Sequence, residues 1–131
     1  MVEFYITHCS ARKSRKKEKI PALERYLAGY IKNIYGLSQK RKKGFLIFSG
    51  KFGFLEPQTK IPYYNKLLQY KDFQKLFNKT DKQYKKHRFK KSIFFHTDPA
   101  KDRNIKPYID FMKEFARRNK VALICRVFKR G

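Results

Sequence analysis

Four short apolar runs, separated by longer amphipathic segments, constrain the fold of this chain more than any other feature. They are EFYIT (3–7), GFLIFS (44–49), SIFFH (92–96) and VALICRV (121–127). Each run is rich in β-branched or aromatic residues and almost continuously apolar, which is typical of strands covered on both faces in a parallel sheet. The sequence therefore predicts four buried strands.

Helical patterns occupy the intervals between these strands. In residues 21–36 apolar side chains recur every three or four positions, Pro21 precedes the pattern and Gly36 follows it, as expected for the start and stop of a helix. Residues 106–120 form a second apolar stripe, and the basic residues at its end complement the helix dipole. Residues 65–84 predict one or two shorter helices.

The alternation of strands and helices predicts an α/β fold. We expect right-handed crossovers, and hence a single three-layer α/β/α domain over residues 1–131 with a mainly parallel four-stranded sheet. A chain of 131 residues is long enough to bury one core and short for two. The stretch 49–63 is long for a connection, and long loops in compact domains are often functional.

The charge balance limits the classes of partner. The chain has 34 Lys and Arg against 10 Asp and Glu, a formal net charge of +24. Such a field attracts polyanions, so DNA or RNA is the expected partner, and anionic membrane surfaces are a second candidate. An AT-rich genome, which favours Lys, Phe, Tyr, Ile and Asn, is an alternative source of part of this charge. The 13 Phe and 9 Tyr exclude a disordered basic tail.

The cysteine content, and the lack of a membrane-spanning run or a signal-peptide pattern, indicate in which compartment the protein is expected. Cys9 and Cys125 give neither a disulfide framework nor a paired zinc knuckle. No apolar run approaches the ~18 residues needed to span a bilayer, and the first residues lack the pattern of a signal peptide. We expect a reduced, cytoplasmic protein with no membrane partner and no cofactor. The oligomeric state stays open.

Basic segments precede the later strands of the predicted sheet. In a parallel sheet these segments share the edge at which the strands begin, the amino edge. Together they form a candidate surface for following a phosphate backbone. The alternative is that they are gatekeepers that protect apolar strands from aggregation. The candidate nucleic-acid-binding residues at this edge are Lys40, Arg41, Lys42, Lys43, Lys85, Lys86, Arg88, Lys90 and Lys91.

The opposite edge, where the parallel strands end, is chemically mixed. We call it the carboxyl edge, and it is where ligands gather in such sheets, at the point where the strand order reverses. Nucleophiles, an imidazole, carboxylates and glycines converge there by topology alone, which predicts a site. The chemistry-bearing residues that follow strands at this edge are Cys9, Ser10, Lys13, Ser49, Tyr63, His96, Asp98 and Asp102.

Four of these residues are candidate catalytic groups. A helix N-terminus and Lys13 would lower the pKa of the Cys9 thiol and make it reactive, whereas an inert cysteine at a strand end is the alternative. Lys13 is a candidate nucleophilic amine or one more phosphate contact. His96 and Asp98 are the candidate acid/base groups.

The remaining candidates would bind the substrate. They are Ser10, Ser49, Gly50, Gly53 and Tyr63. The two glycines would let backbone amides approach a phosphate, or would serve only a tight turn. Tyr63 would offer a stacking face for a base, although core packing accounts for one of the two adjacent tyrosines.

A zinc site built from both cysteines, His8 and His96 has chemically suitable ligands. Its spacing matches no finger or ribbon, so no metal is predicted.

Several short motifs resemble a known group of proteins. Cys9-x-x-x-Lys13, SGKFGFLEP (49–57) and IPYYNKLL (61–68) resemble the small α/β domains of YaaA-like proteins. Residues 9–13, CSARK, are also similar to the core domain of archaeosine synthase, a transfer-RNA modification enzyme in which a lysine is tied to chemistry on a deazaguanine base. The resemblance covers roughly residues 3–68. His8 stands where the archaeosine synthase family has proline, and Ser14-Arg15 replace a proline-tyrosine pair.

Three functional hypotheses follow. The first is a nucleic-acid-associated protein that acts on a nucleobase or nucleotide at the carboxyl edge while the amino edge holds the polymer. The second is a DNA- or RNA-binding module without chemistry. The third, which the YaaA resemblance allows, is a small-molecule or stress-response protein whose charge is incidental.

Overall fold

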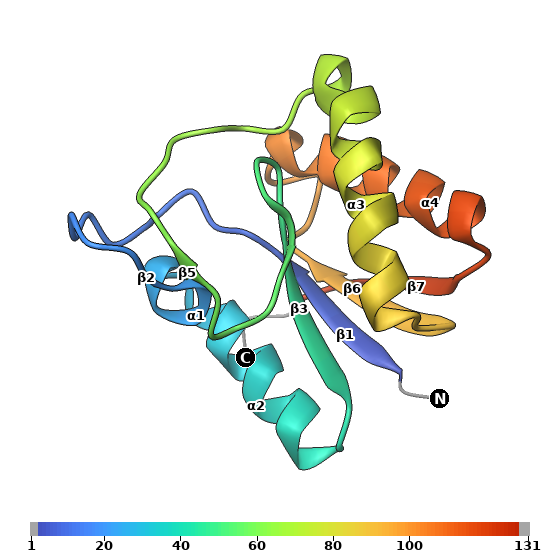
Figure 1. The fold of residues 1–131 in the computed structure, drawn as a ribbon, viewed down its shortest axis with the longest axis horizontal. Coiled ribbons are helices and arrows are strands. Elements are labelled where there is room, and N and C mark those ends of the chain that lie inside the picture. Colours follow the sequence, from blue (N-terminus) through green and yellow to red (C-terminus); the bar gives the residue numbers. More distant parts are fainter. Residues whose placement is uncertain (1–2, 129–131) are drawn as a thin grey trace.

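The computed structural model describes residues 3–128 (Figure 1). Seven strands and four helices follow one another along the chain, with short 3₁₀ turns at Tyr70–Asp72 and Arg103–Ile105. In chain order the elements are β1 (Phe4–His8), β2 (Ile20–Pro21), α1 (Ala22–Arg25), α2 (Gly29–Lys40), β3 (Gly44–Ser49), β4 (Gly53–Leu55), β5 (Lys60–Ile61), α3 (Phe73–His87), β6 (Lys91–His96), α4 (Lys106–Asn119) and β7 (Ala122–Val127).

The predicted mainly parallel α/β sheet is confirmed, with one correction. The main sheet has the strand order β4-β3-β1-β6-β7, and the four predicted strands β1, β3, β6 and β7 are all parallel to one another. The sheet has five strands instead of four, because β4 adds to the free edge of β3 in antiparallel direction. A two-stranded antiparallel ribbon, β2 with β5, lies apart from this sheet.

The extra strand forms because the chain reverses directly after β3. Ser49 Oγ accepts the backbone N–H groups of Lys51 and Phe52, at 3.1 and 3.0 Å, and so fixes the turn. Gly53 has a φ of +74°, and a Cβ there would lie 2.4 Å from Gln83 Oε1. This position therefore requires glycine for the hairpin itself.

Side chains from the central strands reach helices on both faces of the sheet. Tyr5 accepts a hydrogen bond from Arg41 at the end of α2, with 3.1 Å between its hydroxyl and Nη1. Phe48 instead stacks on Phe111 of α4, with ring centroids 5.0 Å apart. Figure 1 shows α2 on one side of the strands and α3 with α4 on the other. The strand order reverses between β1 and β6, which lie between these two groups of helices.

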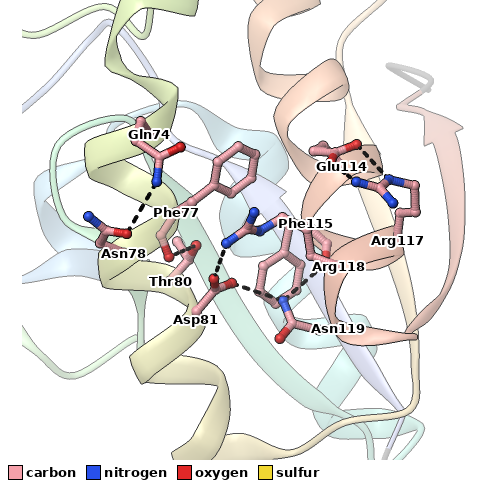
Figure 2. A network of polar contacts seen from close by, with 10 residues as sticks. All are labelled: Gln74, Phe77, Asn78, Thr80, Asp81, Glu114, Phe115, Arg117, Arg118 and Asn119. Carbon is pink, nitrogen blue, oxygen red and sulfur yellow. Dashed lines mark hydrogen bonds and ion pairs between the residues drawn. The ribbon is translucent and has the colours of Figure 1, made fainter.

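A polar cluster joins α3 to α4 (Figure 2). Asp81 of α3 accepts hydrogen bonds from Arg118 and from Asn119, the latter with 3.0 Å between Nδ2 and Oδ1. The Arg118 guanidinium also lies 4.6 Å from the centroid of the Phe77 ring. The cluster fixes the two helices against each other beside the aromatic core.

Replacing Asp81 with alanine should therefore lower the free energy of unfolding by about 1–2 kcal/mol, because two hydrogen bonds between helices are lost, one of them to a charged partner. Glu114→Ala is the matched control, since Glu114 pairs with Arg117 inside the same helix and at a more exposed position. Urea unfolding followed by circular dichroism measures both variants. A loss at Asp81 no larger than that at Glu114 would show that the cluster does not hold the helices together.

Candidate functional site: a cavity at the carboxyl edge

A cavity of about 300 Å³ opens beyond the carboxyl ends of β1 and β6. Its walls come from residues 8–13 after β1, the start of α2, residues 65–67, Thr97, and the segment that leads into α4. This is the point at which the strand order reverses, where open α/β sheets bind their ligands. The fold thus provides a hollow at the edge that the sequence predicts for a site.

His8 joins the two strands beneath the cavity. Its Nε2 accepts the backbone N–H of Thr97 at 3.2 Å, and its Nδ1 lies 2.7 Å from the carbonyl oxygen of Cys9. The neutral ring therefore carries its proton on Nδ1, which donates to that carbonyl. Burial lowers the pKa of His8 to about 4. The imidazole is a neutral connector between the ends of β1 and β6.

Cys9 lies at the centre of a ring of phenols. Its thiol is buried, and Sγ lies 3.9 Å from the hydroxyl of Tyr108, which also accepts the N–H of Leu68 at 3.1 Å. Burial first, and the electrostatic interaction with Cys9 second, raises the pKa of four surrounding tyrosines, Tyr26, Tyr30, Tyr64 and Tyr108. All four phenols are protonated at neutral pH. The Tyr30 hydroxyl donates to the backbone carbonyls of His8 and Cys9, and the hydroxyls of Tyr26 and Tyr64 are hydrogen-bonded to each other.

Lys13 is the ionisable amine nearest this ring. Its Nζ lies 4.6 Å from the centroid of the Tyr64 ring and 5.9 Å from that of Tyr26. Burial lowers the pKa of the Lys13 amine, and the charge of Cys9 offsets this in part. Within residues 3–128 no carboxylate forms an ion pair with it. A half-buried amine with a lowered pKa is suited to attack a ligand or to exchange a proton with it.

Four of the residues predicted at the carboxyl edge line the cavity, namely Cys9, Ser10, Lys13 and Asp102. The hydroxyl of Ser10 donates to the carbonyl of Arg12 at 2.7 Å and so shapes the loop that carries Lys13. The two predicted acid/base groups do not line the cavity. His96 is buried, with Nδ1 2.8 Å from the carbonyl of Thr97, and Asp98 accepts the N–H of Ala100 at 2.9 Å in a turn.

The remaining predicted substrate-binding residues also lie outside the cavity wall. The buried Ser49 hydroxyl is 3.0 Å from that of Tyr64, so it supports the phenol ring from behind. Gly50 lies under Leu68, because a Cβ there would be 2.9 Å from the Leu68 Cβ. Gly53 serves the hairpin. Tyr63 is 40% exposed, and its ring lies near the Arg15 guanidinium.

Several lining residues were missed from the sequence. Tyr30 and Tyr108 belong to the apolar helical patterns of residues 21–36 and 106–120, and both line the cavity. Each lies in the first turn of its helix. In a parallel fold every such turn returns to the carboxyl edge, so this position was the available signal. Asn65, Thr97 and Asn104 carried no comparable pattern.

The predicted basic clusters do share the amino edge. α2, α3 and α4 all end there, immediately before β3, β6 and β7. Basic side chains at helix C-termini offset the negative end of the dipole. Some are also paired, as in Lys43 with Glu3 at 3.3 Å and Lys86 with Glu56 at 3.2 Å. Two of the nine candidate residues at this edge, Lys43 and Lys86, therefore have a carboxylate partner within residues 3–128.

Metal and membrane features are not found among the described residues. Between residues 3 and 128, no three His, Cys, Asp or Glu side chains gather as a ligand set for a metal ion, so the zinc alternative has no coordination sphere there. No helix in this part of the chain combines the length and the apolar character needed to cross a bilayer.

Comparison with known proteins adds no relative. A scan against protein-family models found no match, and searches of the curated proteins and of the solved structures found none either. The candidate site therefore depends on the geometry of this chain.

Proposed function

We propose that this chain is a nucleic-acid-associated protein that takes a nucleobase or nucleotide into the carboxyl-edge cavity of a three-layer α/β/α domain. One observation carries the proposal: a half-buried lysine with a lowered pKa and a buried cysteine line the same cavity, among protonated phenols. A volume of about 300 Å³ is at the small end of ligand sites, which favours a compact ligand.

The lining offers what a base or nucleotide needs. Aromatic and apolar side chains, among them Tyr30, Tyr108 and Ile105, suit the flat apolar surface of a base. Asn65, Thr97 and Asn104 offer polar groups for its edge. Lys13 and Arg12 supply positive charge for a phosphate or for an electron-rich carbonyl.

In this proposal Lys13 and Cys9 are the nucleophilic atoms that face the ligand. Two features support Lys13 over Cys9: it is more exposed, and burial shifts its amine toward the neutral, nucleophilic form. Cys9 is 8% exposed, and its sulfur is directed at the Tyr108 hydroxyl. We therefore assign ligand contact first to Lys13.

A DNA- or RNA-binding module without chemistry is the second candidate function. It is favoured by the net charge of +24, since charge alone supplies most non-specific affinity for nucleic acid. In that case the cavity residues would be structural.

Lys13→Ala tests the first function. We expect affinity for a base or its 5′-monophosphate to fall by about tenfold or more, because a hydrogen bond to a charged group contributes ~1.5–3 kcal/mol. Isothermal titration calorimetry with adenine, guanine, cytosine, uracil and their monophosphates measures this affinity. Affinity for a long polymer should fall much less, because Lys13 is only one of 34 Lys and Arg residues.

Lys32→Ala is the matched control, because Lys32 is exposed on α2 away from the cavity wall. Equal behaviour of the two variants toward the monophosphates would remove Lys13 from the site. Absence of binding by the wild-type protein to every compound in the panel would reject the cavity as a base or nucleotide site.

A further inference from the structure

Residues 12–19, here called the basic loop, belong to the connection from β1 to β2, which extends outward from the sheet (Figure 1). Arg12 and Lys13, at its start, line the cavity. The loop contains six basic residues and one acidic residue, Glu18. The side chains of residues 15–19 are exposed. Within the described range 3–128, no ion pair links a basic side chain of this loop to a carboxylate. Its positive charge is therefore uncompensated.

A buried arginine holds this loop in shape. Arg25 of α1 is 0% exposed, and its Nη1 donates to the carbonyls of Ser14 and Lys16 at 2.6 and 3.0 Å. Its Nη2 donates to the carbonyls of Glu18 and Ile61 at 2.8 and 3.1 Å. Three alternate carbonyls of the loop thus turn inward onto one guanidinium, while the side chains of the loop stay in solvent.

This arrangement is electrostatically unfavourable for the protein alone. Among residues 3–128, the buried Arg25 guanidinium has no carboxylate partner and its Nε has no hydrogen-bond partner. The loop whose carbonyls it binds carries further positive charges. Burying an unpaired charge costs free energy. A bound polyanion would supply the missing opposite charge, and the fixed backbone would spare the cost of ordering the loop on binding.

An aromatic and apolar surface adjoins the loop. Tyr63 is 40% exposed, and the Arg15 guanidinium lies 5.6 Å from the centroid of its ring. Leu67, 45% exposed, lines the cavity itself. A positively charged track beside an exposed ring is the pattern by which proteins hold unpaired strands, since bases stack on the ring while phosphates meet the charges. A duplex offers no unstacked base for either Tyr63 or the cavity.

We propose that the basic loop and Tyr63 bind a single-stranded nucleic acid at the carboxyl edge and present one of its bases to the cavity. This inference rests on the proposed function and moves the polymer away from the amino edge, where the sequence places it. At the amino edge Glu3 and Glu56 pair with basic side chains and three helix C-termini contribute negative dipole ends. At the carboxyl edge the loop charges are unpaired.

Two matched triple variants test the inference. One carries Arg15→Gln, Lys16→Gln and Lys17→Gln in the basic loop, and the other carries Lys40→Gln, Lys85→Gln and Lys90→Gln at the amino edge. All six side chains are exposed, and each variant lowers the formal net charge of +24 by the same three units. Fluorescence anisotropy measures their affinity for labelled single-stranded RNA and DNA of about 12 nucleotides, within the usual site size of small single-strand binders.

We expect the loop variant to lose about tenfold or more in affinity and to reduce the slope of log affinity against log salt by roughly 2, because each lost contact to a single strand contributes about 0.7. The amino-edge variant should stay close to the wild type. An equal or larger loss in the amino-edge variant overturns the inference. Tighter binding to a duplex than to the single strand also overturns it, as does equal binding of the wild type to vesicles of phosphatidylserine and phosphatidylcholine.

Arg25→Lys provides a test at constant net charge. Lysine keeps the positive charge, but its ammonium group cannot donate to all four carbonyls that the planar guanidinium of Arg25 binds. The loop should therefore lose its fixed shape. We expect a severalfold loss of affinity for the single strand, and unchanged affinity would contradict the role of Arg25. If this variant does not fold, the two triple variants still decide the inference. A wild type that binds no polymer would reject nucleic-acid association itself, whereas polymer binding that ignores the loop would reject only the inference.

Discussion

Replacing Phe111 with alanine is expected to lower the free energy of unfolding by about 3–5 kcal/mol, as measured for fully buried phenylalanines. Phe111 of α4 is 0% exposed. Its ring is stacked between Phe48 of β3 and Phe77 of α3, at centroid distances of 5.0 and 4.2 Å. Because β3, α3 and α4 all pack around this ring, a shift of one element alone would not fill the cavity that its removal leaves. Domains of this size are stable by only ~5–15 kcal/mol, so the variant should be close to unfolding.

Phe111→Leu separates the loss of volume from the loss of the aromatic stack. Leucine keeps much of the buried volume, so it should cost clearly less than alanine. Urea unfolding followed by circular dichroism measures both variants, and nucleotide affinity reports whether α4 still places Tyr108 at the cavity. A cost below about 1 kcal/mol for Phe111→Ala would mean that neighbouring rings collapse into the space, and would contradict a tightly packed layer.

The parallel sheet was predictable because each of its parallel strands is an almost continuous apolar run in the sequence. Continuous apolar runs gave all four parallel strands close to their observed bounds. β4 was missed because it has only three residues and forms by pairing with β3, which no local pattern reports. The interpretation of every run as covered on both faces was wrong for β7. This edge strand leaves Ile124 53% exposed, and an apolar run does not distinguish an edge strand from a central one.

The apolar periodicity predicted that helices are present, but it did not predict where each helix begins and ends. The segment 21–36 forms two helices, because Tyr26 leaves the helical conformation, with φ −85° and ψ 124°, and makes a bridge to Lys13. Gly36 does not end the second helix, which continues to Lys40. Residues 65–69 form no helix before α3, and residues 65–67 line the cavity instead. Tertiary contacts override periodicity at each of these places.

The sequence was sufficient to predict the location of the candidate site, at the carboxyl edge of the sheet, but not which side chains line it. Topology brought Cys9 and Lys13 to the carboxyl edge, and both face the cavity. Topology also brought His96 there, but its ring packs against Phe94 at a centroid distance of 5.6 Å and is buried. Whether a side chain at the end of a strand faces the cavity or the core depends on the register of that strand in the sheet, and the sequence alone does not determine this register. In the sequence Arg25 is one polar position within a helical pattern. Nothing in that pattern predicts its hydrogen bonds to the carbonyls of the basic loop.

His8 is expected to make the protein sensitive to acid over a defined range of pH. Burial lowers its pKa from 6.5 to about 4, with the charge of His96 acting in the same direction and the Cys9 carbonyl opposing it. Between these two pKa values the unfolded chain binds a proton at this position that the folded chain does not. Stability should therefore fall as the pH drops from about 6.5 to about 4, and this contribution should level off below that. A shift of this size corresponds to a loss of ~3 kcal/mol.

The physical reason is that protonation breaks the connection beneath the cavity. A doubly protonated ring has no acceptor for the N–H of Thr97, so the contact between the ends of β1 and β6 is lost. Imidazole chemical shifts measured against pH give the pKa of His8 directly, and urea unfolding at each pH gives the stability. His8→Gln is the control, because it removes the titrating group and should flatten the dependence between pH 6.5 and 4. A His8 that titrates near 6.5 would contradict both its burial and its role as the neutral connector between the two strands.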